Sequence, residues 1–143
     1  GMATAATAEP PLAATPDDAE AVVIFTHAVD GWARGARLSH RNLVANLRST
    51  VAAMRLAPDD RMLAVLPFVH SFGLTVTLNA PLSVGAAVLP VERFHPLRVL
   101  ETIEAGGATV LCGVPGVYLG LLAAAARRGV PRHRVRLAIC GGA

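Results

Sequence analysis

The 143-residue sequence has no lysine, and all thirteen of its basic residues are arginines. Any reaction or phosphate contact that needs a side-chain primary amine is therefore excluded for this sequence. Charged residues amount to only 16% and aromatic residues to 4%, whereas apolar residues make up 53%, which excludes a disordered chain. The length is sufficient for one domain with its own hydrophobic core.

The net charge of +3 is small, and most of the arginines are dispersed along the chain. Those between Arg127 and Arg136 are clustered but have no aromatic residues among them, which argues against a nucleic-acid-binding surface. We expect this cluster to be a solvated helix end and loop.

Long apolar runs are also missing, because glycine, proline or a charged residue interrupts each one. We therefore expect no membrane span. The N-terminus has no positively charged segment followed by an apolar stretch, so we expect no signal peptide and a cytoplasmic protein.

Cysteine is limited to Cys112 and Cys140. Two cysteines are too few for a structural zinc site, and no histidine lies at ligand spacing from either, so no metal site is expected. Both lie in apolar strand-like stretches, which predicts buried thiols. No Ser–His–Asp arrangement and no pair of carboxylates stands out as a catalytic set, and we assign no catalytic residue.

Residues 1–19 are rich in alanine, threonine and proline, without periodicity, and are predicted to be a flexible N-terminal tail whose Gly1 is interpreted as a tag remnant. From residue 20 to 143, apolar strand patterns alternate with helical patterns. This alternation predicts an α/β domain with a mainly parallel sheet and helices on both faces. The expected strands are 21–25, 62–68, 86–91, 108–113 and 135–140. The expected helices begin at Ser39, Phe72, Pro96 and Pro115.

A glycine-bearing loop, THAVDGWARG, follows the first predicted strand and spans Thr26 to Gly35. A strand, a glycine-bearing loop and a helix commonly hold nucleotide phosphates through backbone N–H groups and a cation. Arg34 is the available cation. The loop resembles the signature [ST]-S-G-[ST]-[ST]-G-x-P-K-G of adenylate-forming enzymes, a superfamily that includes acyl-CoA synthetases and fatty-acyl-AMP ligases. Thr26, Gly31 and Gly35 match this signature, and Arg34 replaces its lysine.

The other positions of the loop depart from that signature. Val29 and Asp30 replace a pair of hydroxyl residues, so that one donor is lost and a negative charge faces any phosphate. The superfamily has serine, glycine and proline at the positions of His27, Ala28 and Ala33. The loop is a degenerate version of the phosphate loop.

Three further segments resemble the same superfamily, in its order. They are LPFVHSFGLT at 66–75, GVPGVYLGLL at 113–122 and RLAICGGA at 136–143. The resemblance implies a piece of the large N-terminal domain of these enzymes. ATP with magnesium, and CoA, are implied as cofactors by this resemblance alone, and the residues themselves assign none.

The resemblance assigns two groups of binding residues. The substrate-binding group would border an acyl pocket and comprises His70, Gly113, Val114, Pro115 and Tyr118. The cofactor-binding group comprises Thr26, His27, Gly31, Arg34, Gly35, Gly141, Gly142 and Ala143. Other interpretations remain open: His70 as a packed histidine at a strand end, Pro115 as a first helical residue and Tyr118 as a core aromatic residue.

The resemblance implies a relative of ATP-dependent acyl-CoA synthetases and acyl-AMP ligases. The superfamily continues past GGA with a Thr-Glu block, a ribose-binding aspartate and a lysine-bearing C-terminal domain. We therefore expect a truncated or degenerate relative that cannot adenylate a carboxylic acid alone. The alternatives are a non-catalytic module that binds an acyl group, a nucleotide or a protein, and one part of a split ligase. Expected partners are a second copy, giving a dimer, an acyl ligand or a complementary ligase fragment.

Overall fold

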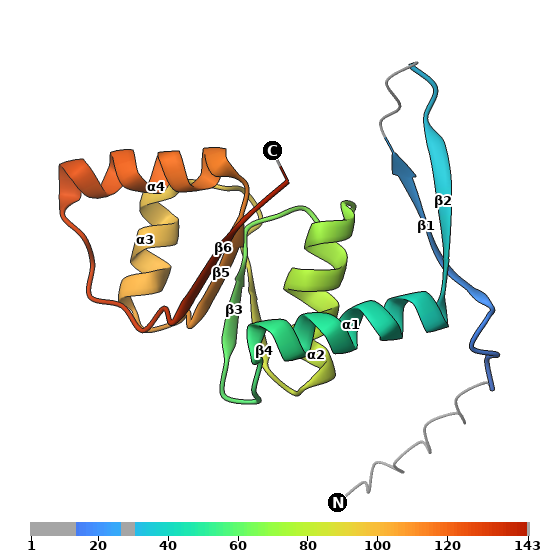
Figure 1. Ribbon diagram of the computed structural model, residues 1–143. Helices are drawn as coiled ribbons and strands as arrows, with labels where there is room; N and C mark the ends of the chain where they lie inside the picture. Colours follow the sequence, from blue (N-terminus) through green and yellow to red (C-terminus); the bar gives the residue numbers. More distant parts are fainter. Residues whose placement is uncertain (1–13, 27–30, 143) are drawn as a thin grey trace, which may run out of the picture.

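A parallel four-stranded sheet forms the centre of the protein in the computed structural model, which describes residues 14–26 and 31–142 (Figure 1). Its strand order is β4-β3-β5-β6, and every neighbouring pair is parallel. The strands are β3 (Arg61–Ala64), β4 (Ala87–Pro90), β5 (Val110–Gly113) and β6 (Leu137–Cys140). The predicted parallel sheet is confirmed.

Helices cover both faces of this sheet, as the alternation predicted. One face packs against α1 (His40–Met54), the π-helical segment η1 (Phe72–Asn79) and α2 (Ala80–Ser83). The other face packs against α3 (Pro96–Glu104) and α4 (Pro115–Arg128). Met62 belongs to the core on the first face and Leu63 to the core on the second, since successive residues of a strand point in opposite directions.

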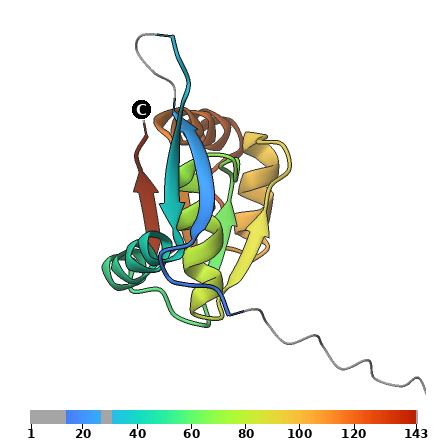
Figure 2. The same ribbon diagram turned by 90° about the vertical axis from the view of Figure 1, so that its right-hand side faces the viewer.

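A separate antiparallel hairpin precedes the sheet and consists of β1 (Glu20–Thr26) and β2 (Arg34–Ser39). Figure 2 shows it in front of the main sheet. The prediction of a loop as far as Gly35 is wrong at its end, because Arg34 and Gly35 lie in β2 and pair with Thr26 and Phe25. The strand β2 was not predicted from the sequence. Its residues from Arg34 to Arg37 are exposed, so it has no alternation of apolar and polar residues.

Ser39 caps α1 as predicted. Its hydroxyl accepts a hydrogen bond from the Asn42 backbone N–H, and the Asn42 side chain accepts one from the Ser39 N–H. Such reciprocal capping satisfies donors that the first helical turn leaves free. The helix therefore begins at a position that the local sequence determines.

Two further predictions are wrong, one on the end of a strand and one on the burial of a thiol. The strand expected over 62–68 ends at Ala64, and Pro67 has no N–H with which to continue a ladder. Cys112 is buried as expected, but Cys140 is exposed, because β6 is an edge strand. Of the tail predicted at 1–19, only 14–19 are described. There the backbone carbonyl of Asp17 accepts a hydrogen bond from the Arg41 N–H at 2.7 Å.

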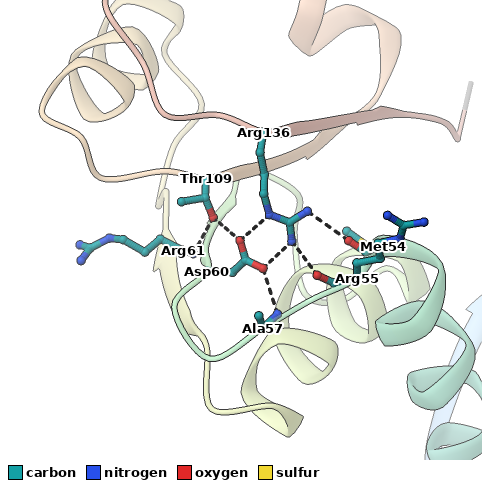
Figure 3. A network of polar contacts seen from close by, with 7 residues as sticks. All are labelled: Met54, Arg55, Ala57, Asp60, Arg61, Thr109 and Arg136. Carbon is teal, nitrogen blue, oxygen red and sulfur yellow. Dashed lines mark hydrogen bonds and ion pairs between the residues drawn. The ribbon is translucent and has the colours of Figure 1, made fainter.

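The amino ends of the strands are joined by a polar network around Asp60, whose side chain is 4% exposed (Figure 3). Arg136 forms an ion pair with Asp60, and its Nε donates to Asp60 Oδ1 at 2.9 Å. The Thr109 hydroxyl donates to the same oxygen at 2.7 Å, and the Ala57 N–H donates to Oδ2 at 3.0 Å. This pairing with Arg136 holds the Asp60 pKa at about 2, well below its usual value.

Arg136 also donates to the backbone carbonyls of Met54 and Arg55 at the end of α1, at 3.3 and 2.9 Å. One guanidinium therefore links α1 to the residues just before β3 and β6. The arginine cluster lies at the end of α4 and in the exposed loop after it, as predicted, but Arg136 is in addition the partner that the buried Asp60 carboxylate requires.

Candidate functional site

The carboxyl ends of β3, β5 and β6 meet at the opposite edge of the sheet. The residues that follow them are Leu66–Ser71 after β3, Val114 after β5 and Gly141–Gly142 after β6. Ligands of open parallel sheets bind at this edge, where successive loops diverge. Residues from three separate segments of the sequence are thereby brought together.

A hollow of about 320 Å³ lies at this edge, and we name it the His70 hollow. It brings together three residues that the sequence analysis assigned to binding: His70, Val114 and Gly142. Its remaining lining is Leu66, Pro67, Ser71, Phe72 and Gly73. Apolar walls with a few polar groups are typical of small-molecule sites.

His70 lies in the turn that leads into η1. Its backbone N–H donates to the Pro67 carbonyl at 3.2 Å, and its carbonyl accepts from the Leu74 N–H at 2.8 Å. The side chain is exposed, so it is not the packed histidine that the alternative interpretation proposed. The backbone is thus held at both ends while the imidazole stays accessible at the rim of the hollow.

Gly73 is a residue of this site that the sequence analysis did not single out. A methyl group there would lie 2.1 Å from the Pro67 carbonyl oxygen and 3.2 Å from that of Leu66. Only a residue without a side chain allows η1 to pack this closely against the loop after β3. The only feature of the sequence that could have indicated this role is the glycine at the end of the LPFVHSFG segment.

Two glycines extend the β5–β6 pair toward the hollow. The Gly141 N–H donates to the Gly113 carbonyl at 3.2 Å, one residue beyond the end of β6. Gly113 is buried, and a methyl group on it would lie 3.0 Å from Val117 Cγ1. Gly142 has a φ of 75°, in the left-handed region that favours glycine.

Pro115 and Tyr118 lie outside the set of residues that line the His70 hollow. Pro115 is the exposed first residue of α4. The Tyr118 hydroxyl lies 2.7 Å from the Ile139 carbonyl and 3.1 Å from the Leu111 carbonyl, between β5 and β6. Burial raises its pKa to about 12. The structure therefore places Tyr118 as a link between strands.

The hairpin contains the described residues of the predicted phosphate loop, while His27 and Ala143 lie outside the described residues. The Thr26 hydroxyl donates to the Arg34 carbonyl at 3.3 Å, and Gly31 has a φ of 81°. A methyl group on Gly35 would lie 2.9 Å from Val23 Cγ1. Cross-strand packing thus accounts for this glycine without a phosphate.

Within residues 14–26 and 31–142, no cluster of three or more His, Cys, Asp or Glu side chains is arranged to hold a metal ion. In the same part of the chain, no helix has the length and apolar character needed to cross a membrane.

Comparison with known proteins gives consistent matches over this region. The chain is 31% identical over 143 residues to a feruloyl-CoA synthase of Amycolatopsis, covering 100% of the chain and 29% of that protein. It is 38% identical over 112 residues to a sulfoacetate–CoA ligase of Cupriavidus necator, covering 78% of the chain and 22% of that ligase.

A solved structure of ATP-bound MatB from Rhodopseudomonas palustris superposes with a TM-score of 0.79 at 33% identity, over 90% of the chain and 25% of MatB. The chain thus spans less than a third of the length of each of these three proteins. The family model of the AMP-binding enzymes matches residues 2–143. This chain belongs to the AMP-binding enzyme family and corresponds to part of the N-terminal domain of adenylate-forming enzymes.

Proposed function

We propose that this chain forms the acid-binding edge of an acid–CoA ligase and holds a carboxylic acid in the His70 hollow. The observation that supports this most strongly is the convergence of His70, Val114 and Gly142 on one hollow from three strand ends. The CoA ligases among its relatives support the substrate class, because each is named for a carboxylic acid that it joins to CoA.

The lining of the His70 hollow suits the two ends of such a ligand. Leu66, Phe72 and Val114 present apolar surface to an acyl chain. The His70 imidazole at the rim is able to donate a hydrogen bond to a carboxylate, a charge-assisted contact.

ATP would activate the carboxylate by forming a mixed anhydride with AMP. We propose that this chain alone binds ATP weakly and does not adenylate an acid. Val29 offers no hydroxyl, Asp30 adds a negative charge, and the Thr26 hydroxyl already donates to the Arg34 carbonyl. A non-catalytic module that binds an acyl ligand remains the alternative, and an assay for adenylation separates it from a ligase.

Titration calorimetry with hexanoate tests the acid site, using His70→Ala and, as a matched control, His95→Ala. His95 is an exposed histidine at the start of α3 and does not line the His70 hollow. Loss of a hydrogen bond to a charged group predicts roughly tenfold weaker binding for His70→Ala and no change for His95→Ala. Equal effects of the two substitutions would refute the assignment of His70.

The same calorimetry with magnesium and ATP, followed by a pyrophosphate-exchange assay, tests the second part of the proposal. We expect no detectable heat at micromolar ATP and no exchange with any acid. Micromolar affinity, or exchange dependent on an added acid, would show that the hairpin is a working phosphate site.

A further inference from the structure

A second hollow adjoins the His70 hollow at the same edge of the sheet. It has a volume of about 560 Å³, against about 320 Å³ for the His70 hollow. Leu66, Pro67 and Val114 line both. The two hollows therefore lie next to each other, along the loop after β3 and the start of α4.

The second hollow, which we name the Phe94 hollow, is apolar except at one point. Phe68, Val91, Phe94 and Val117 contribute its walls, from the ends of β3 and β4 and from α4. Among the residues that the structure describes, Glu92 is the one charged residue of this lining; it is exposed and lies between β4 and α3. Arg93, the next residue along the chain, is not part of the lining. The described lining is therefore apolar apart from one carboxylate at its rim.

Resting on the function proposed above, we propose that the Phe94 hollow receives the far end of the acyl chain and that Glu92 selects against acids with a second carboxylate. An apolar tail gains from leaving water for this lining. A carboxylate at the end of the same tail loses hydration and meets a like charge. The preferred ligand is a monocarboxylic acid with an apolar tail.

A chain-length series tests the tail site by calorimetry with butanoate, hexanoate, octanoate and decanoate. We expect affinity to rise roughly threefold per buried methylene until the Phe94 hollow is full. If decanoate binds no more tightly than butanoate, the tail site is refuted, whereas the proposed acid site survives as long as butanoate binding depends on His70.

Charge reversal tests the selectivity, comparing decanoate with decanedioate, its counterpart with two carboxylates. Glu92→Lys is matched by Glu101→Lys, which makes the same change of net charge at an exposed position of α3 outside both hollows. We expect Glu92→Lys to improve decanedioate binding about tenfold relative to decanoate, and more at low salt. An equal gain in Glu101→Lys would overturn the role of Glu92.

Backbone-amide NMR locates the tail without any substitution. Butanoate should perturb amides near His70 and Gly142, and decanoate should in addition perturb those of Glu92 and Phe94. The competing apolar groove lies between α4 and residues 130–138 and is lined by Leu121 and Val130. Decanoate shifts confined to that groove would refute the tail site, and an absence of shifts near His70 with every acid would refute the proposed function as well.

Discussion

The two edges of the parallel sheet are built in opposite ways. At the amino edge, Asp60 is 4% exposed and accepts hydrogen bonds from three separate segments (Figure 3). At the carboxyl edge, His70 is exposed, and the loops after the strands line two adjoining hollows. One edge satisfies its polar groups internally, while the other leaves surface and polar groups accessible to a ligand.

This difference shows how a small sheet combines stability with an open site. The linked amino edge, together with the two cores, fixes the positions of the strands, so the carboxyl-end loops need not hold the fold together. Substitutions at the amino edge should therefore affect stability, and most substitutions at the carboxyl edge should affect binding. Three experiments test this division between stability and binding.

Gly73→Ala should cause the largest loss, although it lies at the carboxyl edge. The added methyl group would meet the Pro67 carbonyl oxygen at 2.1 Å, and a backbone atom is not free to move aside. Overpacking of this kind costs about 3 kcal/mol, at the upper end of the usual range. Urea unfolding followed by circular dichroism measures the change.

Gly116→Ala is the control, since a methyl group at Gly116, within α4, has no neighbour within 4 Å. Gly116 is the second residue of α4, so alanine there should stabilise the protein by at most the roughly 0.5–1 kcal/mol typical of a helix interior. If Gly73→Ala loses no more stability than Gly116→Ala, the loop after β3 is able to shift away from the added methyl group. The close packing of η1 against that loop would then not be a rigid part of the carboxyl edge.

Arg136→Met should destabilise the protein by about 2–3 kcal/mol. It leaves Asp60 buried without its ion-pair partner and frees the carbonyls of Met54 and Arg55. The side chain of Arg136 is 40% exposed, so the expected loss of stability is smaller than for a fully buried ion pair. Arg134→Met removes the same charge from an exposed position and should change stability little. Hexanoate binding by the folded variants should stay at the wild-type level.

Lowering the pH should reduce the free energy of unfolding by about 2 kcal/mol, because Asp60 becomes protonated. Its pKa falls from 3.8 to about 2 in the folded protein, chiefly because of the hydrogen bond from Arg136. A lowered carboxyl pKa stabilises the folded state above pH 3.8, and this contribution is lost between about pH 4 and pH 2. Urea unfolding across this range measures it. The loss should shrink in Arg136→Met, and an unchanged loss would assign the acid effect to other carboxyl groups.

Much of the fold was predictable because its signs are local. Pro115 marks a helix start through its fixed backbone φ and Ser39 through its capping hydroxyl, and buried strands such as β5 appear as short apolar runs. The hairpin strand β2 was missed because its residues pair with β1 without entering a core. Such pairing leaves no periodic pattern in the sequence.

The candidate site was predictable only through resemblance. His70, Val114 and Gly142 were each identified within a separate sequence block, but their meeting in one hollow depends on the order of the strands in the sheet. The ion pair between Asp60 and Arg136 joins residues 76 positions apart, beyond any local pattern. Gly73 needed the packing of η1 against the Pro67 backbone before its role was visible.

The unequal exposure of the two cysteines makes the carboxyl edge open to selective labelling. Cys112 is buried, and burial raises the pKa of its thiol to about 12, so it is almost wholly protonated near neutral pH and is shielded from reagents. Cys140 is exposed and lies two residues before Gly142, which lines the His70 hollow. A maleimide dye should therefore attach at one position, beside the candidate site, and report ligand binding as a change in fluorescence without any engineered cysteine.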